Sequence, residues 1–322
     1  MAGGRQADGM ITSAEVHSAA SRITGHVRAT PLIEADAGIF PPAGRVWLKL
    51  EQLQHTGSFK VRGAFNRILS AAGQGMLPAA GVVAASGGNA GLAVAYAAAC
   101  HDLPTRVYVP EAAPAVKVDR LRTYGAEVVQ AGSCYAEAYE SAVKHAADAG
   151  ALFCHAYDQP EICAGQGTLG LELLEQTGGQ LDTVLVAVGG GGLMAGVAAA
   201  TEGRASVVGV EPATIPTLHA ALAAGGPVDV DVSGVAADAL GATRLGDIAY
   251  AVATRAGARS VLVDDTDIVA ARKLLWEQYR LAVEHGGATA FAALLAGAYQ
   301  PREGERIALV LCGANTDPAT LS

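Results

Sequence analysis

The sequence predicts an α/β protein built from parallel sheets with helices on both faces. Short apolar runs alternate with longer runs of helical apolar spacing along the chain of 322 residues. The short runs are apolar throughout, as is typical of strands that are covered on both faces. Hydrophobic residues form 51% of the chain and charged residues only 16%, so the chain can bury the large core that such a fold requires.

The alternation divides into two series of elements. The first series is expected at 45–50 (strand), 59–72 (helix), 81–85 (strand), 90–100 (helix), 106–109 (strand), 114–124 (helix), 127–130 (strand), 136–149 (helix) and 151–154 (strand). The second is expected at 161–176 (helix), 183–188 (strand), 193–200 (helix), 206–210 and 260–263 (strands), 266–283 and 287–298 (helices) and 307–311 (strand). Residues 225–242 break the pattern and are predicted to form a long loop, a kind of segment that is often functional.

Charge and cysteine content narrow the class of partner and compartment. The net charge is −9 and no basic run occurs, which argues against a nucleic-acid partner. Five cysteines without a CxxC pair favour a reduced, cytoplasmic setting. Residues 1–10 are polar and lack the apolar stretch of a secretion signal. No apolar run approaches the ~20 residues that span a bilayer, so no membrane segment is predicted.

A lysine opens one of the predicted helices. Lys60 stands in the run GSFKVRG at 57–63, directly after a turn signal. The positive end of a helix disfavours the charged form of an amine, and a neutral amine readily forms a Schiff base. A lone lysine is more often a solvated surface residue. The chemical interpretation of Lys60 therefore depends on the motifs around it.

Two turns between a strand and a helix are candidates for binding anions. The run SGGNAG at 86–91 exposes backbone N–H groups that suit a carboxylate, although an ordinary turn explains it equally well. Four consecutive glycines at 189–192 carry a large conformational cost, which a phosphate cradle justifies. They match neither a dinucleotide fingerprint nor a Walker loop. The run CGAN at 312–315 ends the last strand, where ligands of open α/β sheets bind.

Together these segments resemble the fold type II pyridoxal-phosphate enzymes, specifically the serine/threonine dehydratases and their relatives, the serine racemases. The similarity runs from about Thr30 to Asn315, nearly the whole chain. The matching elements follow the order of the family: SFKVRGA at 58–64, SGGNAG at 86–91, GQGT at 165–168, GGGGL at 189–193, Glu284, and CGAN at 312–315. The resemblance implies two open, twisted sheets flanked by helices. It places a small inserted domain at 55–155 and a large cofactor-binding domain at 1–54 and 156–322.

The resemblance also implies a cofactor, pyridoxal 5′-phosphate, and a role for each matching residue. Lys60 would hold the cofactor as a Schiff base and later move the Cα proton of the substrate. The residues implied to bind the cofactor are Phe59, Lys60, Asn89, Gly189, Gly190, Gly191, Gly192, Leu193, Glu284 and Cys312. Those implied to bind the substrate are Ser86, Gly87, Gly88, Asn89, Ala90 and, as part of the pocket wall, Tyr157. Cys312 would lie at the ring nitrogen as a weak hydrogen-bond partner.

This chain departs from the family pattern at several positions. Gly87 stands where the racemases carry a serine that handles a proton, and Ala90 where many members carry histidine. His285 replaces a proline, with an effect that the sequence leaves open. The cation site of the family would begin at Glu211 and include Ile215 and Thr217. Because Thr217 replaces a second carboxylate, the site suits a monovalent cation such as K⁺ better than a divalent one.

The sequence therefore predicts an ammonia-lyase that converts L-threonine, L-serine or both to 2-oxobutyrate or pyruvate plus ammonia. The family also implies a homodimer. Serine racemase and hydroxyaspartate dehydratase are the near alternatives. A non-catalytic protein that retains the cofactor and binds amino acids is a further alternative, disfavoured because Lys60, Asn89 and the four glycines are intact. The sequence does not decide among serine, threonine and hydroxyaspartate.

Overall fold

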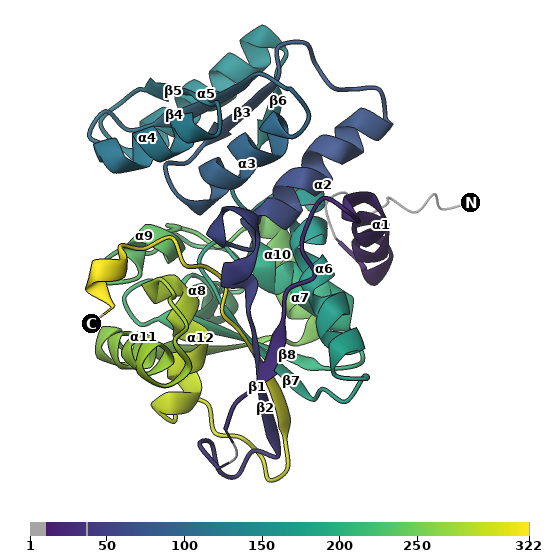
Figure 1. The fold of residues 1–322 in the computed structure, drawn as a ribbon, viewed down its shortest axis with the longest axis vertical. Coiled ribbons are helices and arrows are strands. Elements are labelled where there is room, and N and C mark those ends of the chain that lie inside the picture. The colour runs from purple at the N-terminus through teal and green to yellow at the C-terminus, as the bar shows by residue number, and fades with distance from the viewer. Residues whose placement is uncertain (1–10, 37, 322) are drawn as a thin grey trace.

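The computed structural model describes residues 11–36 and 38–321, and it consists of two lobes that are each built on one sheet (Figure 1). The large lobe contains a six-stranded sheet in the order β1-β2-β10-β7-β8-β9. The small lobe contains a four-stranded sheet in the order β5-β4-β3-β6. Residues 1–10, from which the sequence argued against a secretion signal, lie outside the described part of the chain.

The sheets confirm the predicted α/β class with one exception at an edge. The strands of the large lobe are β1 Leu32–Glu34, β2 Arg45–Lys49, β7 Thr183–Ala187, β8 Ser206–Pro212, β9 Arg259–Val263 and β10 Arg306–Val310. All pair in parallel except β1, which runs antiparallel to β2 and was not predicted. A strand of three half-exposed residues has too little apolar pattern to be recognised in the sequence.

The small lobe shows why its strands are apolar on both sides. Its strands are β3 Val82–Ala85, β4 Thr105–Val109, β5 Glu127–Gln130 and β6 Leu152–Cys154, and its helices are α2 Lys60–Gly73, α3 Asn89–Ala99, α4 Ala115–Thr123 and α5 Tyr135–Ala149. Val82 and Ala84 of β3 pack with α2 and α3, whereas Val83 and Ala85 pack with α5. Successive side chains of a strand point to opposite faces, so both faces of β3 are buried. The partition between the two sheets is compatible with an inserted domain at 55–155, whose boundaries stay a prediction.

The helices of the large lobe include several that the sequence analysis missed. They are α1 Ser13–Ile23, α6 Pro160–Gln176, α7 Gly192–Thr201, α8 Thr217–Ala224, α9 Ala237–Leu240, α10 Asp247–Ala256, α11 Asp265–Tyr279 and α12 His285–Leu295; short 3-10 turns lie at Glu51–Leu53, His55–Gly57 and Pro318–Thr320. We did not predict α1, α8, α9 or α10, although Thr12 and Glu15 form a capping box at α1. The short helix α9 lies within the predicted loop 225–242. The predicted helix 266–283 was too long, because Arg280 adopts a left-handed φ of 55° and ends α11. None of the described helices is long and apolar enough to cross a membrane.

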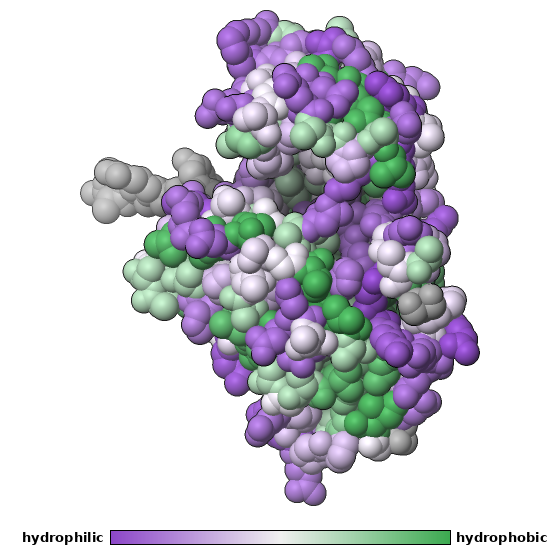
Figure 2. All heavy atoms as spheres, turned by 90° about the vertical axis from the view of Figure 1, so that its left-hand side faces the viewer, coloured by the Kyte–Doolittle hydropathy of each residue, from purple (hydrophilic) through white to green (hydrophobic). Residues whose placement is uncertain are grey.

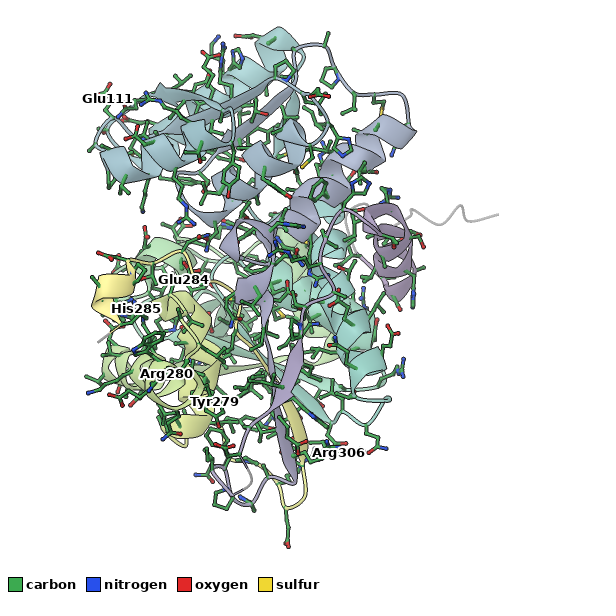
Figure 3. The ribbon with its side chains drawn as sticks, viewed as in Figure 1. Glu111, Tyr279, Arg280, Glu284, His285 and Arg306 are labelled. Atoms are coloured by element: carbon green, nitrogen blue, oxygen red, sulfur yellow. The ribbon has the colours of Figure 1, made fainter. Side chains whose placement is uncertain are left out.

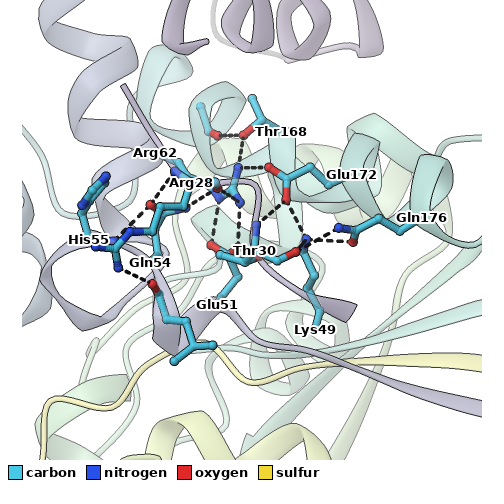
Figure 4. Close-up of polar contacts among 12 residues, drawn as sticks. Arg28, Thr30, Lys49, Glu51, Gln54, His55, Arg62, Thr168, Glu172 and Gln176 are labelled. Atoms are coloured by element: carbon cyan, nitrogen blue, oxygen red, sulfur yellow. Dashed lines mark hydrogen bonds and ion pairs between the residues drawn. The ribbon is translucent and has the colours of Figure 1, made fainter. Parts of the chain in front are cut away.

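The start of α2 is fixed to the large lobe by a buried ionic network (Figure 4). Arg62 donates to both carboxylate oxygens of Glu51, at 2.7 and 2.8 Å, and to Glu172 at 2.6 Å. Lys49 on β2 donates to Glu172 at 2.6 Å and to the carbonyl of Thr30 at 2.8 Å. The side chains of Arg62, Glu51 and Lys49 are fully buried, so each charge needs its partner. Arg62 lies two residues after Lys60, and the network therefore also fixes the position of that lysine.

We expect Arg62→Met to lower the free energy of unfolding by about 3–5 kcal/mol, because it leaves the carboxylate of Glu51 buried without its partner. Urea denaturation followed by circular dichroism measures this loss. Arg67→Met is the matched control, since Arg67 lies on the same helix and pairs with Glu161 at 3.0 Å with both side chains partly exposed. A loss of less than about 1 kcal/mol is expected for this control. Equal losses for the two variants would contradict the structural role of the network.

Candidate active site

One cavity at the boundary between the lobes brings together residues from distant parts of the sequence. Its lining consists of Phe59, Lys60, Asn89, Tyr157, Ala187, Gly189, Gly190, Gly191, Gly192, Leu193, Ala239, Leu240, Glu284 and Cys312. The lining includes every residue predicted to bind a cofactor, and also Tyr157. Ser86, Gly87 and Gly88 are outside the lining itself but form the turn between β3 and α3, directly before Asn89, and Ala90 follows Asn89 in the first turn of α3.

Lys60 is the first residue of α2, which begins one residue later than predicted. Its Nζ donates a hydrogen bond to the carbonyl of Ala156 at 2.7 Å and lies 5.0 Å from the centroid of the Phe59 ring. Burial lowers the pKa of Lys60 to about 8. The sequence attributed a lowered pKa to the end of the helix, whereas the structure shows that removal from water is the main cause. An appreciable fraction of Lys60 is therefore a neutral, nucleophilic amine near neutral pH.

The four glycines form the turn from β7 into α7. The helix begins at Gly192, one residue earlier than predicted, and Gly191 adopts a φ of 84°. A Cβ atom on Gly190 would lie 2.3 Å from the ring of Tyr157, so no larger residue fits beside that ring. The first N–H groups of an α-helix have no partner within the helix. This turn therefore offers backbone donors and the positive end of α7 to an anion such as a phosphate.

Asn89, the first residue of α3, contacts Glu284, which directly precedes α12 of the large lobe (Figure 3). Asn89 Nδ2 donates to Glu284 Oε1 at 2.6 Å, and Asn89 Oδ1 accepts a hydrogen bond from Asn315 Nδ2. Burial raises the pKa of Glu284 to about 7, and the negative charge of Asp238 acts in the same direction. Glu284 is therefore close to half protonated at neutral pH.

Cys312 follows the end of β10 and is buried. Its Sγ donates to the carbonyl of Gly286 at 3.5 Å. Burial raises the pKa of the Cys312 thiol far above its ordinary range, so the thiol stays neutral at pH 7. The group is then a weak hydrogen-bond partner and supplies no negative charge to a ligand.

Two buried polar side chains next to the cavity lining have no hydrogen-bond partner within the described chain. Ser58 precedes Phe59 and is fully buried, and its hydroxyl is unpaired. The amide of Gln166 is also unpaired, and its Oε1 lies 2.9 Å from the position of a Cβ atom on Gly192. An unpaired buried polar group is costly, so these side chains are suited to a polar ligand or to ordered water.

Glu211, the predicted start of a cation site, lies at the end of β8 and is fully buried. Its carboxylate accepts hydrogen bonds from the backbone N–H groups of Leu218 and His219, at 2.6 and 2.9 Å. It also accepts a hydrogen bond from the hydroxyl of Ser260 at 2.6 Å, and the hydroxyl oxygen of Thr217 lies 3.2 Å from it. The carboxylate thereby fixes the first turn of α8 beneath the sheet edge.

Thr217 connects this carboxylate to the glycine turn. Its hydroxyl donates to the carbonyl of Gly189 at 2.5 Å, and its N–H donates to the carbonyl of Ile215 at 3.1 Å. Two of the four groups that contact the Glu211 carboxylate are hydroxyl oxygens, of Ser260 and Thr217, and the other two are backbone N–H groups. Oxygen atoms are the ligands that a hard cation prefers. Among the described residues, no three His, Cys, Asp or Glu side chains converge as a metal site does.

The sequence analysis missed some residues that the structure places at this site. Ala239 and Leu240 line the cavity, and they lie in the segment 225–242 that we predicted as a loop without naming residues. Lys117, Arg120 and Asp238 lie at the boundary between the lobes, where they make contacts across it. The position of residues 225–242 downstream of a strand of the large sheet could have indicated that this segment lies near the site. No sequence pattern, however, links the segment to α4.

Comparison with known proteins agrees with this geometry. The model of the family described as "Pyridoxal-phosphate dependent enzyme" matches residues 23–313. The chain belongs to the pyridoxal-phosphate dependent enzyme family. Pyridoxal phosphate also fits the residues present in the cavity, because a backbone anion cradle, an amine of lowered pKa and an amide donor match its phosphate, its aldehyde and its ring oxygen.

Individual members of this family resemble the chain over most of its length. The chain is 37% identical over 316 residues to the L-threonine ammonia-lyase of Geobacter sulfurreducens, covering 97% of this chain and 78% of that protein. It is 38% identical over 305 residues to the phenylserine dehydratase of Ralstonia pickettii, covering 94% of this chain and 92% of that protein. The structure of maize serine racemase is 32% identical and similar with a TM-score of 0.89, over 96% of this chain and 95% of that chain.

The raised pKa of Glu284 predicts how the stability of the cofactor-free chain depends on pH. The folded chain keeps the proton of Glu284 up to about pH 7, whereas the unfolded chain releases it near 4.5, so stability falls as the pH rises between these values. The free energy of unfolding falls by about 3 kcal/mol over this whole pH range. Glu284→Gln removes this fall, and urea denaturation at several pH values should show a flatter pH profile for this variant. Glu34→Gln, at an exposed pair, should keep the wild-type profile. Parallel profiles for wild type and Glu284→Gln would contradict the assignment.

Proposed function

We propose that this chain is a pyridoxal-phosphate-dependent ammonia-lyase that acts on L-threonine, L-serine or both. The observation that carries the proposal is the position of Lys60: an amine with a pKa of about 8 lies in the same cavity as the glycine turn and Asn89. The 37% identity to an L-threonine ammonia-lyase over nearly the whole chain supports the substrate class. The products would be 2-oxobutyrate or pyruvate, plus ammonia.

Different residues of the cavity have different roles in such a reaction. When bound, pyridoxal phosphate supplies an electron sink that weakens the Cα–H bond of the amino acid. The glycines of the turn into α7 would hold its phosphate, and Asn89 Nδ2 would donate to its ring oxygen. Lys60 Nζ takes the Cα proton, which its lowered pKa permits near neutral pH. The backbone of the turn that contains Gly87 and Gly88 binds the substrate carboxylate.

Racemisation is the nearest rival activity, favoured by the similarity to maize serine racemase. It requires a proton donor on the face of Cα that is opposite Lys60. Gly87, at the position that carries this donor in the racemases, has no side chain. A Cβ atom there would lie 3.5 Å from Val109 Cγ1 and 3.9 Å from Lys117 Cδ, which is ordinary contact, so the packing around this position does not itself require glycine. We therefore propose that elimination exceeds racemisation.

A bulkier hydroxy amino acid is a second candidate substrate. The chain is similar to a phenylserine dehydratase over 94% of its length, and the aromatic ring of Tyr157 lines the cavity. Tyr157 packs edge-on against His155, with ring centroids 4.7 Å apart. Aromatic walls of this kind bind an aromatic β-substituent through ring–ring contacts. A 3-phenylserine substrate therefore belongs in any test of the activity, together with hydroxyaspartate.

We expect the purified holoenzyme to release keto acid from L-threonine or L-serine, and Lys60→Ala to abolish both this turnover and the visible absorbance of covalently bound cofactor. The reason is that no other amine lines the cavity in the described chain. The assay compares L-threonine, L-serine, 3-hydroxyaspartate and 3-phenylserine, and it measures D-serine alongside pyruvate. Turnover by Lys60→Ala would disprove the assignment of Lys60. D-serine formed as fast as pyruvate would favour the racemase instead.

We also propose that a monovalent cation, K⁺, binds among the oxygen atoms of Glu211, Thr217 and the carbonyl of Ile215. Burial raises the pKa of Glu211, and a cation beside the carboxylate would offset the cost of its buried charge. The hydroxyl of Thr217 donates to the carbonyl of Gly189, so an ion bound here would also stabilise the position of the glycine turn. A single carboxylate carries one negative charge, so it neutralises a monovalent cation more completely than a divalent one.

We expect K⁺ to raise the thermal stability and activity of the holoenzyme more than Mg²⁺ does, with tetramethylammonium chloride used to keep the ionic strength constant. Glu211→Gln should lose the response to K⁺, because the neutral amide attracts a cation less strongly. Differential scanning fluorimetry and the keto-acid assay measure the two effects. Unchanged stability and activity after exhaustive removal of K⁺, combined with a strict need for Mg²⁺, would contradict the proposal.

We further propose that the enzyme is a cytoplasmic homodimer with residues 55–155 as its small inserted domain. The described cysteines are all free, including the exposed Cys100 and Cys134, which supports a reducing compartment. The separate cores of the small lobe support the inserted domain. Sedimentation equilibrium of the holoenzyme measures the oligomeric state.

A further inference from the structure

Helix α4 of the small lobe lies directly above α9 of the large lobe, on the left side of the molecule in Figure 1. Figure 2 views this side and shows hydrophilic residues where the lobes meet. Two side chains one helical turn apart on α4 cross the boundary. Lys117 forms a salt bridge with Asp238 of α9, and Arg120 Nη2 donates a hydrogen bond to Asn315 Oδ1. Neither contact belongs to the residues that line the cavity.

We propose that Lys117 and Arg120 form a two-point clamp between the lobes, and that Arg120 is a positioning residue that sets the orientation of the Asn89 amide through Asn315. The proposal depends on the place of Asn89 in the cofactor cavity and is independent of which amino acid the enzyme converts.

The orientation argument follows from the chemistry of the amide group. The two ends of an asparagine side chain differ, because the oxygen only accepts hydrogen bonds and the nitrogen only donates them. Arg120 has donors alone, so Asn315 must turn its oxygen toward it. The nitrogen of Asn315 then faces the carbonyl of Thr56 at 2.9 Å and the oxygen of Asn89. Both fixed partners of Asn315 thus favour the same orientation.

The orientation of the Asn315 amide determines the orientation of the Asn89 amide. With its oxygen engaged by Asn315, Asn89 presents Nδ2 to Glu284 and to the cavity. A ring oxygen of the cofactor is an acceptor and needs this donor. If the amide of Asn89 turned over, two oxygens would face each other and the hydrogen bond to the ligand would be lost. Arg120 therefore acts on the cofactor through two amides without touching it.

The second contact of the clamp crosses the turn that contains Gly87 and Gly88. Lys117 Cδ lies 3.9 Å from the position of a Cβ atom on Gly87, and the carbonyl of Asp238 lies 3.9 Å from that on Gly88. Asp238 alone would place a negative charge next to the turn that is proposed to bind a carboxylate. Its pairing with Lys117 removes this repulsion and holds the lobes together over the turn. One helix, α4, therefore both connects the two lobes and orients Asn89.

The affinity of the cofactor-free chain for pyridoxal phosphate, measured by fluorescence titration, tests the orientation. Arg120→Met should weaken binding roughly tenfold, the loss of about one charge-assisted hydrogen bond, and should shift the absorbance maximum of the bound cofactor. Arg120→Lys keeps a donor and should restore most of the affinity. The melting temperature of the cofactor-free chain should stay unchanged, since Arg120 lies on an exposed surface. Unchanged affinity in Arg120→Met, or equal loss in Arg120→Lys, would overturn the proposal.

A charge exchange tests the second point of the clamp by the same titration. Lys117→Glu places two carboxylates opposite each other and should weaken cofactor binding at least fivefold, whereas the double variant Lys117→Glu/Asp238→Lys should recover it. Lys144→Glu is the matched control, because Lys144 pairs with Asp148 within α5 of the same lobe. A double variant that binds no better than Lys117→Glu, or a control that weakens binding equally, would show that the contact across the boundary has no role.

Discussion

The ion pairs between Arg62 and the carboxylates of Glu51 and Glu172 are the constraint on which the rest of the site depends. They join α2 to the short turn after β2 and to α6, so a segment 110 residues away in the sequence shares one buried centre with the start of α2. Because Lys60 lies at the first residue of α2, half a turn from Arg62, its amine has little freedom to move away from the cavity. A wider cavity of about 610 Å³ lies beside the network, between α1 and α6, and is lined by Arg62 and Glu172. This cavity contains none of the residues of the proposed chemistry.

The charges in the cofactor cavity are kept low by burial. Lys60 is partly neutral, Cys312 remains a thiol, and Glu284 holds a proton in part of its population at neutral pH. An anionic ligand therefore meets backbone N–H groups and the end of α7 instead of an opposing ion. Such donors are fixed by the fold and need no rearrangement when a ligand binds. The fully charged side chains lie outside the lining of the cavity, in the Arg62 network and in the contacts of α4.

The sequence predicted the parallel sheets because strands such as β7 are apolar on both faces, and it predicted the residues of the cavity through their motifs. It did not predict α8 and α10, although each helix ends at a glycine with positive φ, Gly225 and Gly257. The apolar periodicity between Glu211 and Arg259 was too irregular for us to recognise these ends. The contacts of Lys117 and Arg120 were outside the reach of sequence reasoning, because their partners lie more than a hundred residues away and no local pattern encodes such a meeting.

The contact between Gly190 and Tyr157 has a consequence for how this protein can vary. The ring of Tyr157 occupies the space that any side chain at position 190 would need. The two positions are therefore restricted as a pair: a residue larger than glycine at 190 is compatible only with a much smaller residue at 157. Related sequences with a residue larger than glycine at 190 should therefore carry a small residue at 157, whereas 157 can become smaller while 190 stays glycine. A replacement within the anion-binding turn at 190 consequently depends on an earlier change of the pocket wall at 157, so new substrate preferences at this wall would precede any loss of that glycine.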